Sequence, residues 1–102
     1  MKLTPEQAHA AHDLALYAVN TRELYPDAIQ IMKARAAYSV DPASLQCWGH
    51  FTRRARALYA RELGHNGSMF DTRTFVAAVR EIHEHYAEQQ AEILAELKGA
   101  TA

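Results

Sequence analysis

Apolar residues recur at three- and four-residue steps along most of the chain, which is the spacing of one face of an α-helix. The clearest run lies between Pro42 and Leu63. Asp41 stands where an N-cap residue would stand, Pro42 at the first helical position and Gly64 just beyond the end. The apolar positions of this run are Leu45, Trp48, Phe51 or Thr52, Ala55, Leu58, Tyr59 and Leu63. Because this stripe holds the only tryptophan, we expect the helix at the centre of the fold, covered by the others.

Two shorter helices are predicted before this central one. The first runs from Pro5 to about Val19, because a Thr-x-x-Gln capping box precedes it. The second ends near residue 38 and starts either at Thr21, with a bend at Pro26, or at Pro26 after a turn. Proline inside a helix costs about 3 kcal/mol, which favours a break or kink near Leu24. The predicted buried face of the second helix is Leu24, Ala28, Ile31 or Met32, and Ala36.

The last predicted helix is also the longest. It starts at Ser68 or Asp71, both good caps, and runs to about Leu97, with Gly99 as the stop. Its apolar stripe is Phe75, Val76, Val79, Ile82, Tyr86, Ile93 and Leu97.

Polar residues interrupt this last stripe after Tyr86. Gln89 and Gln90 take positions that would otherwise be apolar, so we expect the remaining part to lie outside the main core. A helix of about 39 Å would overhang a bundle of shorter partners. The overhang could pack on a second copy of the chain, which predicts a homodimer through the C-terminal helix.

These segments together predict an all-α fold, a small bundle of three to four helices with a long C-terminal helix. The chain of 102 residues, 49% of them hydrophobic, suits a single helical domain over residues 1–102. Cys47 is the only cysteine, which excludes an intrachain disulfide and a CxxC motif. The N-terminus lacks an apolar signal core and no run approaches the ~20 apolar residues of a membrane span. We therefore expect a cytoplasmic protein with no membrane partner.

Charge is balanced overall but unevenly placed. The formal net charge is −1, yet residues 22–80 carry a local net of +4 and residues 81–102 a local net of −4. Glutamates four apart form an acidic ridge on the last helix: Glu84, Glu88, Glu92 and Glu96. Neighbouring like charges at this spacing cost a few tenths of a kcal/mol per pair. The ridge is therefore either a solubilising face relieved by arginines of a packed helix, or a docking strip for a basic partner or a mimic of nucleic acid.

The central helix carries basic residues opposite its apolar stripe: Arg53, Arg54, Arg56 and Arg61. Such a face can contact phosphates. The stretch from Ala60 to Gly64 also resembles the first helix and turn of a helix-turn-helix. The match fails beyond it, because Arg73 stands where a buried aliphatic residue is usual and the loop is too long and glycine-rich for the three- to four-residue turn. The alternative function is therefore a small nucleic-acid-binding transcriptional regulator.

Candidate chemistry is sparse. Glu6 and His9 match one Glu-x-x-His half-motif of di-iron bundles, and His12 lies one turn further along. Such bundles need two of these motifs, so a metal-dependent helical enzyme ranks lowest among the alternatives. We find no catalytic set of residues and no phosphate-cradling glycine loop, and we expect no enzymatic activity, metal or other cofactor.

From Asn20 to about residue 90 the chain resembles a group of short uncharacterised proteins of bacteriophages and conjugative plasmids. The matching residues are Glu23-Leu24-Tyr25, Ile29, Tyr38, Asp41-Pro42, Trp48, Tyr59-Ala60-Arg61-Glu62-Leu63-Gly64, Phe70 and Glu84-His85-Tyr86. The group usually has a glycine before the tyrosine of the second connection, where this chain has Ala37. The resemblance implies an accessory protein of a mobile element that binds a host or viral macromolecule, as inhibitors of CRISPR–Cas complexes do.

The predicted function is therefore that of a non-enzymatic binding protein. Its partner is expected to be a protein, contacted through the acidic ridge and the arginines of the last two helices. Nucleic acid is the alternative partner.

Overall fold

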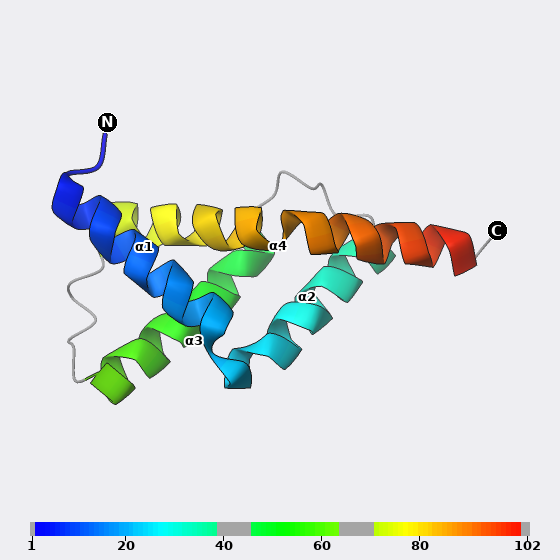
Figure 1. Ribbon diagram of the computed structural model, residues 1–102, viewed down its shortest axis with the longest axis horizontal. Coiled ribbons are helices and arrows are strands. Elements are labelled where there is room, and N and C mark those ends of the chain that lie inside the picture. Colours follow the sequence, from blue (N-terminus) through cyan, green and yellow to red (C-terminus); the bar gives the residue numbers. More distant parts are fainter. Residues whose placement is uncertain (1, 39–45, 64–70, 101–102) are drawn as a thin grey trace.

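The computed structural model describes residues 2–38, 46–63 and 71–100, and almost all of these are helical (Figure 1). The elements are α1 (Pro5–Asn20), the short 3-10 turn η1 (Arg22–Leu24), α2 (Tyr25–Ala37), α3 (Gln46–Leu63) and α4 (Thr72–Ala100). No strand occurs in these ranges. The predicted all-α bundle with a long C-terminal helix is confirmed.

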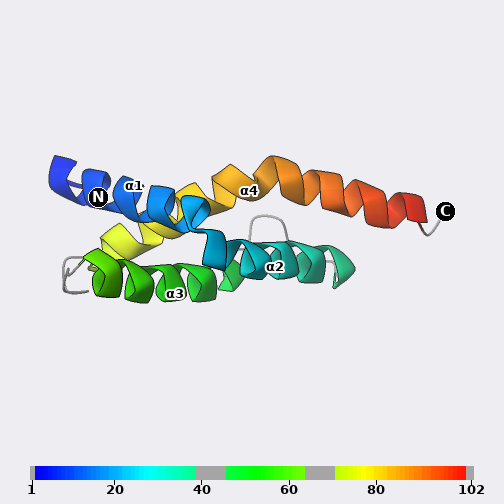
Figure 2. The same cartoon turned by 60° about the horizontal axis from the view of Figure 1, so that its bottom comes forward.

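The helices form two layers. Figure 2 shows α1 and α4 in one layer and α3 and α2 in the other. The contact between α1 and α4 is the most extensive of the bundle, whereas α2 and α3 touch each other little. In Figure 1 α4 spans most of the length of the molecule, and its C-terminal part extends beyond α1.

The first helix is capped as the sequence predicts. The backbone N–H of Gln7 donates to the Thr4 hydroxyl at 3.1 Å, and the Thr4 N–H donates to the Gln7 side chain at 3.0 Å. The residues that α1 buries are Ala11, Leu14, Ala15 and Ala18. Since most of these side chains are small, α1 packs closely on α4.

The predicted break before α2 is confirmed. Leu24 closes the 3-10 turn, and α2 begins at the next residue with Pro26 inside its first two positions, where a proline N–H is not needed. The buried face of α2 differs from the prediction at one place. Arg35 is only 3% exposed, while Ala36 is half-buried.

Aromatic side chains of α3 and α4 fill the centre of the molecule. The Trp48 ring stacks on Tyr86 with centroids 5.1 Å apart and meets Phe51 edge-on at 5.4 Å. Phe51, Thr52, Ala55 and Tyr59 are also buried, which confirms the central stripe of α3 over these positions. The predicted cap at Asp41, the stop at Gly64, and the side chains of Leu45 and Leu63 lie outside the described residues.

The last helix begins at the second of its two predicted caps. The Thr74 N–H donates to the Asp71 carboxylate at 2.9 Å, while Ser68 lies outside the described residues. The helix continues through Gly99 to Ala100, so the predicted end near Leu97 is too early. Glycine lowers helix propensity by about 1 kcal/mol, and at an exposed helix end this does not stop the helix.

The expectation that α4 leaves the core after Tyr86 is wrong for its next two turns. The Gln90 side chain donates to the Met32 carbonyl at 2.9 Å, and the Gln89 side chain donates to the Tyr25 hydroxyl at 3.2 Å. Ile93 still packs against the core. The two glutamines therefore hold α4 on α2, and the overhang is limited to the last turns.

The Asp71 cap makes stability depend on pH. The hydrogen bonds from Thr74, its backbone N–H first, lower the pKa of Asp71 below its ordinary value of 3.8. The ionised cap therefore stabilises the fold fully above that value, and its contribution is lost as the pH falls through the lower folded-state pKa. Asp71→Asn keeps a capping oxygen without the charge. Thermal unfolding followed by circular dichroism should show a larger loss of Tm for the wild type than for this variant between about pH 5 and about pH 2. Equal losses would show that the charge of Asp71 contributes nothing.

Candidate functional site

The acidic ridge lies on the solvent side of α4. All four glutamates, Glu84, Glu88, Glu92 and Glu96, are exposed. At about 1.5 Å rise per residue, successive Cα positions in the ridge are about 6 Å apart and the whole ridge is about 18 Å long. It starts beside α1 and continues along the part of α4 that extends beyond α1 (Figure 1).

No basic side chain relieves the ridge within the described part of the chain. The ion pairs found there are His9–Asp13, His12–Glu81 and Arg54–Asp27, and none includes a ridge glutamate. The alternative in which arginines of a packed helix neutralise the ridge is therefore not observed. The ridge carboxylates face water.

The four arginines of α3 do not act as one surface. Arg54 pairs with Asp27 of α2. The Arg56 guanidinium lies over the Phe75 ring, 5.1 Å from its centroid, and is half-buried. Arg53 and Arg61 are exposed. Arg54 and Arg56, two of the four arginines predicted to contact phosphates, therefore hold α3 to α2 and α4.

The helix bounds agree with the failure of the helix-turn-helix match. The end of α3 at Leu63 and the start of α4 at Thr72 leave an interval of eight residues. The motif needs about three or four residues between its helices. The end of α3 therefore does not open such a motif.

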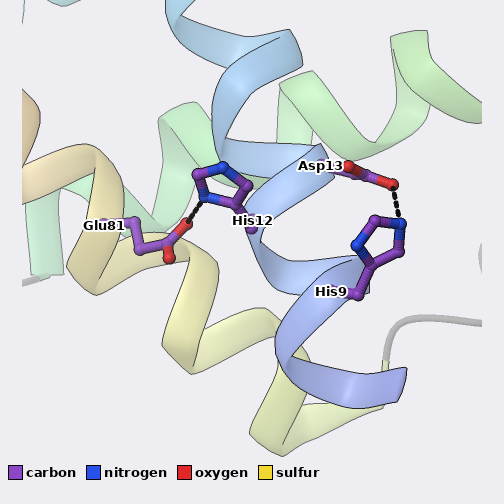
Figure 3. Close-up of polar contacts among 4 residues, drawn as sticks. All are labelled: His9, His12, Asp13 and Glu81. Atoms are coloured by element: carbon purple, nitrogen blue, oxygen red, sulfur yellow. Dashed lines mark ion pairs between the residues drawn. The ribbon is translucent and has the colours of Figure 1, made fainter. Parts of the chain in front are cut away.

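The histidines of α1 form two separate contacts (Figure 3). His9 lies 3.3 Å from Asp13 one turn along the same helix. His12 Nδ1 lies 3.4 Å from Glu81 Oε2 and joins α1 to α4. Glu81 Oε2 accepts no hydrogen bond although it is shielded from solvent.

No metal centre follows from these residues. Because His9 and His12 belong to different pairs, they do not form a ligand set with Glu6. Across residues 2–38, 46–63 and 71–100, no three His, Cys, Asp or Glu side chains are placed to hold a metal ion. The metal-enzyme alternative thus gains no support from the described residues.

Each shifted pKa has a structural explanation. Burial raises the pKa of Tyr86 in the aromatic centre, with a smaller effect of Tyr25. Desolvation raises the pKa of Tyr17, and so does its hydrogen bond to Glu62, to which the hydroxyl donates at 2.7 Å. This bond ties α1 to the end of α3, and Asp71 caps α4. None of these groups sits with a second perturbed group in a cleft, which is the pattern typical of catalysis.

Hollows on the surface are open or small. A small, partly enclosed hollow of about 120 Å³ lies beside the aromatic centre and is lined by Arg35, Trp48, His83, Tyr86, Ala87 and Gln90. A larger open groove of about 480 Å³ lies on the outer side of α4 and is lined by Leu3, Thr72, Arg73, Val76, Ala77 and Arg80.

Sequence reasoning missed the two arginines of the larger groove. Arg73 and Arg80 are seven residues apart, and Arg80 is four residues before Glu84. One step of the ridge spacing backwards from Glu84 would have found Arg80, and Arg73 lies seven residues before Arg80 on the same helix face.

Comparison with protein-family models, with curated proteins and with solved structures finds no match to this chain. Its resemblance to mobile-element accessory proteins therefore stays a prediction. No described helix combines the length and apolar character needed to cross a membrane.

Proposed function

We propose that this protein is a non-enzymatic binding protein whose acidic ridge on α4 docks a basic surface of a partner protein. The observation that supports the proposal is the exposure of all four ridge carboxylates with no ion pair to any of them among the described residues. Four like charges in a row destabilise an isolated helix by a few tenths of a kcal/mol per neighbouring pair. A basic partner removes that repulsion.

Charge spacing favours a basic protein over mimicry of nucleic acid. The ridge carries one charge per about 6 Å of helix axis, whereas duplex DNA carries one per about 1.7 Å. The ridge is therefore much less densely charged than the duplex. Lysines or arginines four apart on a helix have the same spacing as the ridge, which makes a basic helix the best-matched partner.

The resemblance to mobile-element proteins is consistent with this partner. Nucleic-acid-binding proteins, including CRISPR effector complexes, carry basic surfaces, and a basic helix on such a protein is the partner that the spacing of the ridge fits. The alternative function, direct binding of nucleic acid through α3, is less well supported, because Arg54 and Arg56 already contact Asp27 and Phe75.

The test uses a synthetic helical peptide with lysine at every fourth position and alanine elsewhere. We expect salt-sensitive binding, measured by fluorescence anisotropy of the labelled peptide. Each exposed ion pair contributes about 0.2–1 kcal/mol. Glu88→Lys/Glu92→Lys turns two attractions into repulsions and should weaken binding about tenfold or more.

A charge-matched control separates the ridge from net charge. Glu6→Lys/Glu23→Lys makes the same change in charge at exposed positions on α1 and η1 and should leave binding nearly unchanged. Circular dichroism checks that both variants stay helical. Equal weakening by the two variants, or no binding by the wild type at low salt, would contradict the proposal.

A further inference from the structure

The outer groove on the first third of α4 has an apolar floor and basic sides. Leu3, Val76 and Ala77 form the apolar part, and Arg73 and Arg80 also line the groove. Val76 is 40% exposed, although the sequence predicts it in the apolar stripe of this helix. The groove therefore suits a segment with small apolar residues and acidic side chains.

Further along the same helix the charge changes sign. Glu84 follows Arg80 by one turn, Glu88 follows one turn later, and the exposed Ala87 lies between the two glutamates. This outer face of α4 thus has arginines in its first third, with Ala77 between them, and glutamates in its middle, with Ala87 between them. The middle of α4 therefore carries the acidic and small side chains that would fit the groove on the first third of the same helix in another copy.

We infer that a second copy of this chain lies across the groove with its α4 antiparallel. A two-fold axis near residue 82 places Arg80 of each copy beside Glu84 of the other, and Arg73 toward Glu88. Ala77 of one copy then faces Ala87 of the other, and small residues let two helices approach to about 8 Å. A parallel arrangement in register would set like charges against each other.

Pairing within one helix is the main competitor. Arg80 and Glu84 are four residues apart, but this order, with the cation first, is the weaker one for a helix. They form no ion pair within the described structure. Both side chains are exposed and remain available for the second copy.

The dimer is expected to be weak. Antiparallel pairing about residue 82 overlaps the two helices over residues 72–92, about 30 Å, and a contact about 10 Å wide then covers roughly 300 Å² of each copy. Standard interfaces bury about 800 Å² per partner. We therefore expect a dissociation constant in the micromolar range or weaker that rises with salt. Dimerisation is a property separate from the proposed function, because the part of the ridge beyond Glu88 stays accessible to a partner protein in the dimer.

Sedimentation velocity over a wide range of protein concentration tests the inference with a charge exchange. Arg80→Glu alone places glutamates against each other in the dimer, and Glu84→Arg alone places arginines against each other. Each variant alone should stay monomeric where the wild type dimerises. An equal mixture of the two should form a heterodimer, because both contacts then join opposite charges.

The control exchanges charges away from this face. Arg53→Glu and Glu23→Arg, alone or mixed, should leave the wild-type monomer–dimer equilibrium unchanged, because both positions are exposed on other elements. A monomeric wild type at every concentration, single variants that still dimerise, or a mixture that stays monomeric would overturn the inference. None of these outcomes bears on peptide binding by Glu88 and Glu92, so failure here is distinct from failure of the proposed function.

Discussion

Replacing Trp48 with alanine is expected to lower the free energy of unfolding by about 3–5 kcal/mol. The side chain is 1% exposed and touches the rings of Tyr86 and Phe51, so the substitution removes a large buried surface and two aromatic contacts. Its loss leaves a cavity between α3 and α4. Urea unfolding followed by circular dichroism measures the change. The expected loss is large, because the total free energy of unfolding of a small domain is only about 5–15 kcal/mol.

Two companion variants keep this prediction testable. Trp48→Phe retains part of the ring and should cost clearly less, and it remains useful if the alanine variant does not fold. Tyr38→Ala removes an aromatic ring that is 80% exposed and should change stability by less than about 0.5 kcal/mol. A loss below about 1 kcal/mol for Trp48→Ala would place the tryptophan outside the core.

Leu24→Ala is expected to cost about 2–5 kcal/mol. Leu24 is 0% exposed and lies in the 3-10 turn that directs the chain from α1 into α2. Truncating it removes the apolar contact that fixes this turn. The measurement is again the free energy of unfolding in urea.

The neighbouring residue supplies the control for Leu24. Glu23 is exposed in the same turn, so Glu23→Ala should change stability by less than about 0.5 kcal/mol. Similar losses for both variants would show that the turn is sensitive to any substitution rather than anchored by Leu24.

Local rules predicted most of the fold. The Thr4–Gln7 capping box, the cap at Asp71 and the break before Pro26 depend on neighbouring residues only, and each is confirmed. The apolar spacing around Trp48 also identified the buried side of α3. These features follow from the sequence because their hydrogen bonds and periodicity lie within one helix turn or one helix.

Contacts between helices set the features that were predicted wrongly. Gln89 and Gln90 are polar and were expected to face solvent. Their side chains instead donate hydrogen bonds to the Tyr25 hydroxyl and the Met32 carbonyl of α2. Arg35 looks exposed by the same argument and is buried. Periodicity treats a polar side chain as outward-facing, so it cannot recognise one that pairs with a neighbouring helix.

The candidate site shows the same division. The spacing of Glu84 and the three following glutamates placed them on one face, and their exposure is confirmed. Whether arginines would relieve them depended on the helix packing. Arg54 and Arg56 instead contact Asp27 and Phe75, so the predicted arginine surface is divided.

Chemical-shift mapping of the lysine peptide on isotopically labelled protein tests the central claim most directly. We expect the largest amide shifts between Glu84 and Lys98, and we expect them to decrease as salt is added. A peptide of the same composition with its lysines spread around the helix should give smaller shifts. Largest shifts around Arg53 and Arg61, or equal shifts with both peptides, would contradict a binding role for the acidic face of α4.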